Sequence, residues 1–255
     1  KKNSHKGEFG HIAIVGGGPG MHGAVCIAGE AALRSGAGKV SIFTHISHNS
    51  LIADSRPELI FHFFEEVDEI KPMLLDVDVI AIGPGLGVNK WAKNVFESII
   101  DVDCPMIVDA DALNILSKKP IKRENWILTP HPGEAGRLLC QSSKKIQQNR
   151  FYSLNDLIEK YHGVIVLKGH HTLIGSTASV PCVCVKGNPG MASAGMGDAL
   201  TGIIASMIGQ GAPLGIAAAL GVEIHAKAGD IAATQGQRGL LAGDLIGQIR
   251  GCVNP

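Results

Sequence analysis

The sequence lacks an excess of charge of either sign. Its 255 residues carry 23 basic and 23 acidic side chains, so the formal net charge is zero. It has no basic run or arginine-rich stripe, which argues against a nucleic-acid-binding protein. Its apolar stretches are interrupted by Gly, Asp or His well before the length of about 18 residues that a membrane helix needs. We therefore predict no nucleic-acid partner and no membrane partner.

Paired cysteines are also lacking. The six cysteines include no C-x-x-C pair, and no Cys/His spacing matches a zinc site, so we predict no zinc site and assign no residue as a metal ligand. Cys182 and Cys184 would lie on one face of a strand, where a disulfide has poor geometry. Free thiols indicate the reducing cytoplasm, and the polar first residues of the chain show no signal peptide.

Short apolar runs alternate with helical patterns through the first two thirds of the chain. Strands are predicted at residues 11–15, 39–44, 59–64, 77–82, 106–109, 126–128 and 163–167. Helices are predicted at residues 24–35, 89–101, 110–116, 133–139 and 153–161. Repeated strand–helix units whose strands are apolar throughout are typical of a mostly parallel sheet that is covered by helices on both faces. With no linker or repeat in the sequence, we predict a single α/β domain over residues 1–255.

The last third of the chain has a different pattern. Residues 172–174 and 179–185 predict a hairpin or meander around Gly175, and a glycine-rich loop follows at 187–197. Helices rich in Ala and Gly are predicted at residues 198–208, 214–232 and 241–249. Their small side chains allow close packing against the sheet, against each other or against a partner chain.

Polar or glycine-rich loops follow five of the predicted strands. They have the sequences GGGPGMHG (16–23), GPGLG (83–87), DADALN (109–114), TPHPGE (129–134) and KGHHT (168–172). In open α/β sheets, ligands bind at the carboxyl ends of the strands. Five such loops at one edge of the sheet therefore indicate a binding site.

The clearest binding signal is the segment NPGMASAGMGD, residues 188–198, which leads into a helix. Its glycines leave backbone N–H groups free to face one concavity, and the helix N-terminus adds a partial positive charge. Together these features predict an anion hole for a phosphate. Asp198 is either an N-cap carboxylate or a functional group beside the phosphate, acting as a base or orienting a hydroxyl, and the flanking glycines favour the second interpretation.

The other polar residues near strand ends have two interpretations each. His131 is either part of a rigid surface turn or a ligand contact, and Lys168 is either a solvated tip or a phosphate contact. Asp109 and Asp111 either cap the next helix or hold Mg²⁺ through water. His225 is interpreted as packed or facing a partner. Four further histidines are left without an assigned role and are expected at the surface rather than in catalysis: His45, His48, His170 and His171.

The first of these loops contains G-x-G-x-x-G, the pattern of a dinucleotide-binding Rossmann turn. That turn requires an acidic residue about 20 positions further on, at the end of the second strand. Here the second strand ends in Phe43, Thr44 and His45, with no acid. The predicted phosphate site also lies far along the chain, so we reject a Rossmann dinucleotide site.

The chain resembles the ADP/ATP-dependent (6S)-NAD(P)H-hydrate dehydratases, a branch of the ribokinase-like superfamily. Nine motifs between His5 and Leu245 carry the resemblance: HKGEFG, GGGPGMHGA, ALRSGAGKV, GPGLG, DADALN, TPHPGE, VLKGHHT, NPGMASAGMGDALTGIIA and GLLAGDLI. The resemblance implies a ribokinase-like three-layer α/β/α sandwich around a mostly parallel sheet. It also implies a repair reaction, in which a nucleotide phosphorylates the hydroxyl of hydrated NADH or NADPH (NADHX or NADPHX) and loss of phosphate regenerates the cofactor.

The resemblance also implies roles for individual residues. Asp198 would be the catalytic base or orienting group, and the substrate would contact Ala24, Gly85, Gly87, His131 and Asp198. The adenine nucleotide would contact Lys168, Gly169, His170, His171, Thr172, Asn188, Gly195 and Gly197. Bacterial members use ADP and others ATP, with Mg²⁺ expected alongside. His170 and His171 stand where small residues are usual, and Met196 replaces a usual Ser, which puts side-chain contacts in doubt at these positions.

The resemblance also implies partners, and two alternative functions remain open. The family implies a homo-oligomer and an epimerase that is fused to many relatives, and a start at Lys1 is compatible with a piece of such a fusion. A vitamin-precursor or sugar kinase of the same superfamily would share the Asp198 loop. A nucleotide sensor would keep the fold without turnover. The TPHPGE and GGGPGMHGA motifs favour the dehydratase.

Overall fold

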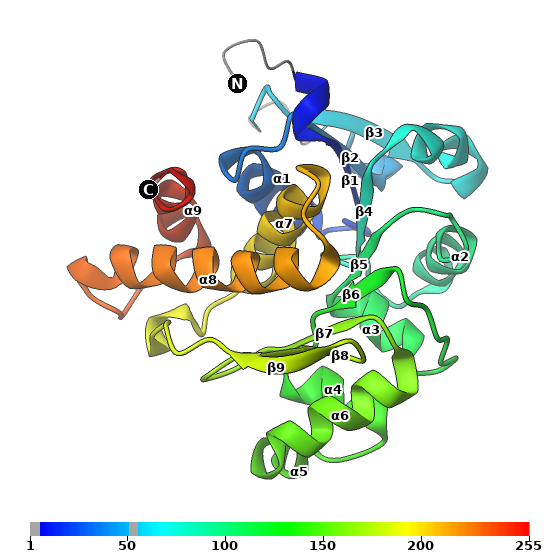
Figure 1. The fold of residues 1–255 in the computed structure, drawn as a ribbon. Helices are drawn as coiled ribbons and strands as arrows, with labels where there is room; N and C mark the ends of the chain where they lie inside the picture. Colours follow the sequence, from blue (N-terminus) through cyan, green and yellow to red (C-terminus); the bar gives the residue numbers. More distant parts are fainter. Residues whose placement is uncertain (1–5, 51–55, 255) are drawn as a thin grey trace.

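The computed structural model describes residues 6–50 and 56–254, and the strands of this part form one sheet (Figure 1). The strand order is β3-β2-β1-β4-β5-β6-β7-β8-β9. The strands are β1 (His11–Val15), β2 (Lys39–His45), β3 (Ile60–Phe64), β4 (Val79–Ile82), β5 (Met106–Val108), β6 (Trp126–Leu128), β7 (Val164–Leu167), β8 (Leu173–Ser176) and β9 (Ser179–Val183). All pairs from β3 to β7 are parallel, and β8 and β9 are added antiparallel. The prediction of a mostly parallel sheet is confirmed.

Helices cover both faces of this sheet (Figure 1). One face carries α2 (Lys90–Ile99), α3 (Ala110–Leu116), α4 (Pro132–Leu139), α5 (Ser143–Gln148) and α6 (Arg150–Tyr161). The other face carries α1 (His22–Arg34), α7 (Met196–Gly209) and α8 (Leu214–Ala232). Outside them, α9 (Ala242–Val253) packs against α1 and α8. The structure is the predicted three-layer α/β/α sandwich.

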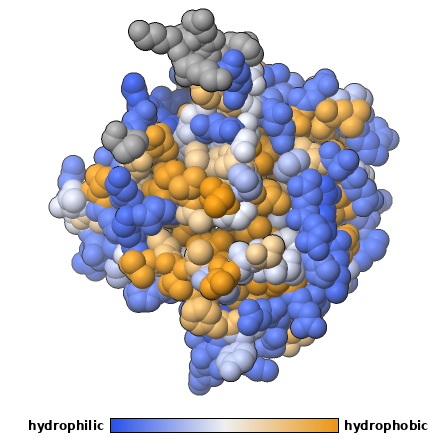
Figure 2. Space-filling view, viewed as in Figure 1, coloured by the Kyte–Doolittle hydropathy of each residue, from blue (hydrophilic) through white to orange (hydrophobic). Residues whose placement is uncertain are grey.

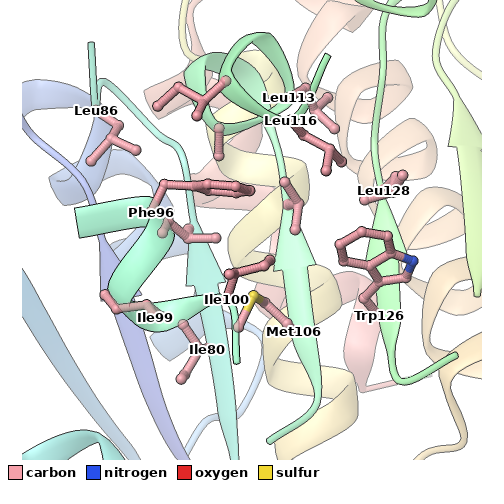
Figure 3. Close-up of a cluster of buried hydrophobic side chains, with 14 of the residues drawn as sticks. Ile80, Leu86, Phe96, Ile99, Ile100, Met106, Leu113, Leu116, Trp126 and Leu128 are labelled. Atoms are coloured by element: carbon pink, nitrogen blue, oxygen red, sulfur yellow. The ribbon is translucent and has the colours of Figure 1, made fainter. Parts of the chain in front are cut away.

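The two cores explain why the central strands are apolar throughout. Along β4, Ile80 and Ile82 face the layer of α2 and α3, whereas Val79 and Ala81 face α7 and α8. Side chains alternate between the faces of a strand, so a strand between two helical layers needs an apolar residue at every position. Figure 3 shows the first of these cores, in which Phe96 of α2 packs between the sheet and α3.

Some predicted boundaries are wrong. Gly175 is not the turn of the hairpin but lies in β8, paired with Ile165, and the turn is at residues 177–178. A Cβ at Gly175 would lie 3.0 Å from Leu154 Cδ2, so glycine here lets α6 pack closely on the strand. The short helix α5 was not predicted. Of the family motifs, HKGEFG begins at His5, which lies outside the described residues.

The order of the strands places the ends of β1 and β4 side by side. From β1 the chain moves outward to β2 and β3, and it then crosses back to β4 on the other side of β1. Ligands of open α/β sheets bind where the strand order reverses in this way.

Among the helices of the described part, none is long and apolar enough to cross a membrane.

Candidate active site

The five predicted loops lie at one edge of the sheet, since they follow the carboxyl ends of parallel strands. The first two are joined directly: the amides of Gly17 and Gly18 donate to the carbonyls of Pro84 and Gly85, at 2.9 and 2.7 Å. Gly85 also lies against the first turn of α1, because a Cβ there would be 3.0 Å from the Cβ of Ala24. Two of the residues predicted to bind substrate, Ala24 and Gly85, are therefore neighbours.

The glycine loop after β1 is not a phosphate cradle. Besides Gly17 and Gly18, the amide of Gly16 donates to Phe43 O at 3.1 Å, and that of Gly20 donates to His48 Nε2 at 3.2 Å. These amides hold the loop to β2 and to the loop after β4, and so they cannot bind phosphate oxygens. This geometry agrees with the rejection of a Rossmann dinucleotide site.

His48 is buried, with 1% of its surface exposed, so its assignment to the surface is wrong. Thr44 Oγ1 donates to Gly17 O at 2.8 Å, and His48 Nδ1 must therefore donate to Thr44 Oγ1, at 3.0 Å. His48 Nε2 is then left to accept from Gly20. Burial lowers the pKa of His48, and the neighbouring imidazoles of His22 and His45 lower it further. A neutral His48 thus ties the glycine loop to the end of β2.

A buried ion pair lies at the centre of the five loops. Lys168 Nζ is 2.7 Å from Asp109 Oδ1 and 3.9 Å from Glu134 Oε2, and Thr201 Oγ1 of α7 donates to Asp109 Oδ2 at 2.8 Å. Burial alone would raise the pKa of Asp109, but Lys168 outweighs it and the pKa is lowered. Burial would lower the pKa of Lys168, but Asp109 and Glu134 raise it. Lys168 is therefore a fixed, charged group rather than a solvated tip.

Asp198 is the third residue of α7, not its N-cap, which is Gly195. Its carboxylate accepts no hydrogen bond from any residue that the structure describes. Burial raises the pKa of Asp198 to about 7, with Asp109 adding to the shift and Lys168 opposing it. A half-buried, unpaired carboxylate with a pKa near neutrality can take a proton from a bound hydroxyl at physiological pH.

The amides before Asp198 are available to an anion. Gly195 has φ +86° and Gly197 lies over Lys168, since an added Cβ would be 3.2 Å from Lys168 Nζ. Over the described residues, the amides of Met196, Gly197 and Asp198 have no acceptor, as expected for the first turn of a helix. The carbonyl of Met196 is held by His225 Nε2 at 2.9 Å, which shows that His225 is packed against α7. The amides that we predict to form an anion hole thus lie between Lys168 and Asp198 and have no acceptor among the described residues.

His131 and Glu134 cap α4 reciprocally. The amides of Gly133 and Glu134 donate to His131 Nδ1, at 2.9 and 3.4 Å, and Glu134 Oε2 accepts from the amide of His131 at 2.7 Å. Because Nδ1 accepts twice, the imidazole proton of His131 must be on Nε2, which lies 3.4 Å from Glu134 Oε1. The ring is half exposed, so this nitrogen can donate to a ligand.

Other predicted site residues have structural partners. Asn188 donates to Asp230 Oδ1 at 2.9 Å and accepts from Gly190 N at 3.0 Å, so its side chain holds its own loop to α8. Asp111 accepts from Gly87 N at 2.8 Å and from Asn114 Nδ2 at 3.2 Å. His170 and His171 are exposed, with ring centroids 3.8 Å apart. No group of three or more His, Cys, Asp or Glu among the described residues could hold a metal ion.

Two residues of the site were not predicted from the sequence. Glu134 is buried beside Lys168, and burial raises its pKa to about 7, with Lys168 opposing the shift and Asp109 adding to it. Thr201 lies one turn after Asp198 and holds Asp109. Glu134 could have been found from the sequence, because it is the last residue of the TPHPGE motif. For Thr201 the sequence offers only its spacing of three residues from Asp198, which places both on one face of a helix.

Replacing Gly197 by alanine should separate stability from nucleotide binding. Alanine favours a helix, so we expect a gain in the free energy of unfolding of up to about 1 kcal/mol. The new methyl would sit 3.2 Å from Lys168 Nζ, inside the anion hole, and we expect severalfold weaker ADP binding. Thermal denaturation and calorimetric titration with ADP measure the two effects. Unchanged ADP binding would place the phosphates elsewhere.

The sequence is similar to proteins of one known family. A family described as NAD(P)H-hydrate dehydratase matches residues 12–250. The bifunctional NAD(P)H-hydrate repair enzyme Nnr of Coxiella burnetii is 49% identical over 255 residues, which are 100% of this chain and 52% of that protein. The ADP-dependent (S)-NAD(P)H-hydrate dehydratase of Neisseria meningitidis is 37% identical, over 97% of this chain and 85% of that protein. The chain thus spans about half the length of its bifunctional relatives.

Solved structures give the same result. The ADP/ATP-dependent NAD(P)H-hydrate dehydratase of Bacillus subtilis, co-crystallised with ATP/Mg²⁺, superposes with a TM-score of 0.87 at 30% identity, over 99% of this chain and 91% of that chain. A ribokinase of Arabidopsis thaliana superposes with a TM-score of 0.64 at 10% identity, which shows that the fold is shared.

Proposed function

Since this chain belongs to the NAD(P)H-hydrate dehydratase family, we propose that it repairs hydrated NADH and NADPH as a single dehydratase domain. The observation that carries the proposal is the unpaired carboxylate of Asp198, with Lys168 and the free amides of α7 beside it. Phosphoryl transfer requires mainly positioning and stabilisation of charge, and this arrangement supplies both.

Asp198 takes the proton of the substrate hydroxyl as its oxygen attacks the terminal phosphoryl group of the nucleotide. With ADP, the bond to the bridging oxygen breaks and AMP leaves. Lys168 and the amides of α7 neutralise the charge that develops on the phosphoryl oxygens. The phosphorylated hydroxyl then leaves as phosphate, and loss of a ring proton restores the double bond of the nicotinamide. His131, which can only donate through Nε2, orients the substrate.

Magnesium would enter with the nucleotide. Asp109 and Asp111, two candidate ligands, already hold Lys168, Thr201, Gly87 and Asn114. Mg²⁺ commonly keeps several waters and binds through substrate phosphates with one or two carboxylates. The ion would therefore be held by the nucleotide phosphates and water, and when bound it would neutralise phosphate charge.

The test is recovery of the reduced cofactor. Incubation of the chain with NADHX or NADPHX and either ADP or ATP should restore the absorbance of the reduced nicotinamide, and the two nucleotides should differ in rate. Phosphorylation of a vitamin precursor or sugar without this recovery would support a kinase. Binding of nucleotide without any turnover would support a sensor.

The activity should fall on acidification through the pKa of Asp198. Burial holds this pKa at about 7, and the reaction requires the ionised form, so kcat/KM should fall about tenfold per pH unit below pH 7 and level off above it. Glu134 titrates in the same range. A pH–rate profile of Glu134→Gln distinguishes the two groups, because the midpoint should persist in this variant if Asp198 controls it.

The remaining partners are also proposals. Because the chain spans about half of Nnr-type relatives, an epimerase of the hydrates is the expected companion activity. The six cysteines are free, which supports the reducing cytoplasm as the location. For a homo-oligomer, a surface is offered by α8 and the edge strand β9, where Figure 2 shows hydrophobic residues. Exposed side chains are Ile216 and Leu220 on α8, Val180 and Val183 on β9, and Val185 just after β9.

A further inference from the structure

An arginine outside the predicted site holds the backbone of the loop that carries Lys168. Arg150, the first residue of α6, donates from Nη2 to Leu167 O at 3.0 Å and to His171 O at 3.3 Å. Its Nη1 donates to Lys168 O at 3.3 Å and to Gln147 Oε1 at 3.0 Å. One guanidinium group therefore binds the carbonyl of Leu167, the last residue of β7, and two carbonyls of the KGHHT loop.

These contacts determine which way the peptide groups of the loop face. In a trans peptide the C=O and the N–H point in opposite directions, so a carbonyl turned toward Arg150 turns the next amide away from it. Three amides follow these carbonyls: that of Lys168 donates to Pro130 O at 2.9 Å, whereas those of Gly169 and Thr172 have no acceptor in the described part of the chain. Arg150 lies on the α6 side of the sheet, whereas Gly197 approaches Lys168 from the α7 side. The two amides therefore point away from the α6 side of the loop, and no described residue accepts from them.

Gly169 and the charge of Arg150 support this arrangement. Gly169 has φ +139°, and a Cβ there would lie 2.7 Å from Arg150 Nη1, so a side chain at 169 would displace the guanidinium. Arg150 is half-buried and forms no ion pair with a described carboxylate. Its positive charge is therefore not neutralised by the protein and favours an anion bound at the loop.

We propose that Arg150 is a positioning residue for the adenine nucleotide: it orients the 168–172 loop so that the amides of Gly169 and Thr172 bind the nucleotide phosphates. The inference rests on the proposed function for the identity of the nucleotide. Lysine cannot replace Arg150, because a single ammonium cannot reach three carbonyls in the planar geometry of a guanidinium.

The test is calorimetric binding of ADP to the whole chain, with Arg123→Met as the matched control for Arg150→Met. Arg123 also binds three carbonyls, those of Ile100, Val102 and Cys104, but at the amino end of β5, away from the site. Both variants should lose comparable thermal stability. We expect Arg150→Met and Arg150→Lys to weaken ADP binding about tenfold or more, and Arg123→Met to leave it unchanged.

Two further readouts separate positioning from general instability. In the dehydration assay, Arg150→Met should raise KM for ADP more than it lowers kcat, with KM for NADHX unchanged. Guanidinium at millimolar concentration should partly restore ADP binding to Arg150→Ala, and sodium chloride at equal ionic strength should not. Equal losses of ADP binding in the Arg150→Met and Arg123→Met variants, or no loss in either, would overturn the proposal, as would a wild type that binds no ADP. A wild type that binds ADP but repairs no hydrate would overturn the proposed function alone.

Discussion

Asp198→Asn is expected to lower kcat by a factor of about 10² to 10⁴, the usual contribution of a general base. The carboxylate has no partner in the described structure, and its pKa of about 7 suits it to accept the hydroxyl proton. Asparagine keeps the shape of the side chain but cannot accept a proton. Single-turnover measurements with NADHX and ADP would show the loss in the phosphoryl-transfer step, while calorimetry should show that ADP still binds.

The same substitution should stabilise the protein. The pKa of Asp198 is raised from 3.8 to about 7, so the folded state binds more protons than the unfolded state between these values. Stability is therefore lost as the pH rises through this range, and it stays lower above it. At pH 8 the neutral asparagine should recover on the order of 1–3 kcal/mol of unfolding free energy.

Asp244 of α9 provides a matched control. It is also the third residue of its helix and also follows a glycine, but its carboxylate caps the helix by accepting from Leu241 N at 2.9 Å. Asp244→Asn should therefore cost stability and leave kcat unchanged, the opposite of Asp198→Asn. If both variants lost stability and kept their rate, Asp198 would be an ordinary helix-capping residue.

The contrast between these two aspartates shows what the sequence could and could not predict. Both occur as Gly-Asp before an apolar run, and either could be an N-cap. Only the structure distinguishes them, because capping depends on the rotamer of the side chain and on what surrounds it. The period of the apolar residues, by contrast, is a local property, so all nine predicted strands and the three layers were confirmed.

The site residues that were missed or misplaced depend on contacts between distant segments. Thr201, which was missed, meets Asp109 across 92 positions of the chain, and His48, which was misplaced, meets Gly20 across 28. No local pattern specifies such pairs. A histidine in a polar stretch is usually exposed, whereas His48 is buried and accepts from Gly20 of the loop after β1. Loop position could be predicted, whereas the partner of each side chain could not.

Lys168→Met is expected to lower the free energy of unfolding by about 3–5 kcal/mol, because it leaves the buried Asp109 without its cation. In the wild type the pKa of Asp109 is lowered, so its contribution to stability is present above its unfolded pKa and is lost as the pH falls. Without Lys168, burial should raise this pKa instead. The variant should then be closer to the wild type at pH 5 than at pH 8 in denaturant unfolding.

The double variant Lys168→Met/Asp109→Asn tests whether the loss comes from the buried charge. A neutral amide can still accept from Thr201, which donates to Asp109 at 2.8 Å, and no unpaired carboxylate remains. Most of the lost stability should return, since removing both partners of a buried pair costs less than removing one. A double variant no more stable than Lys168→Met would mean that Lys168 stabilises the fold through packing of its methylene chain. In either case ADP binding should remain weak, because the charge that faces the anion hole is gone.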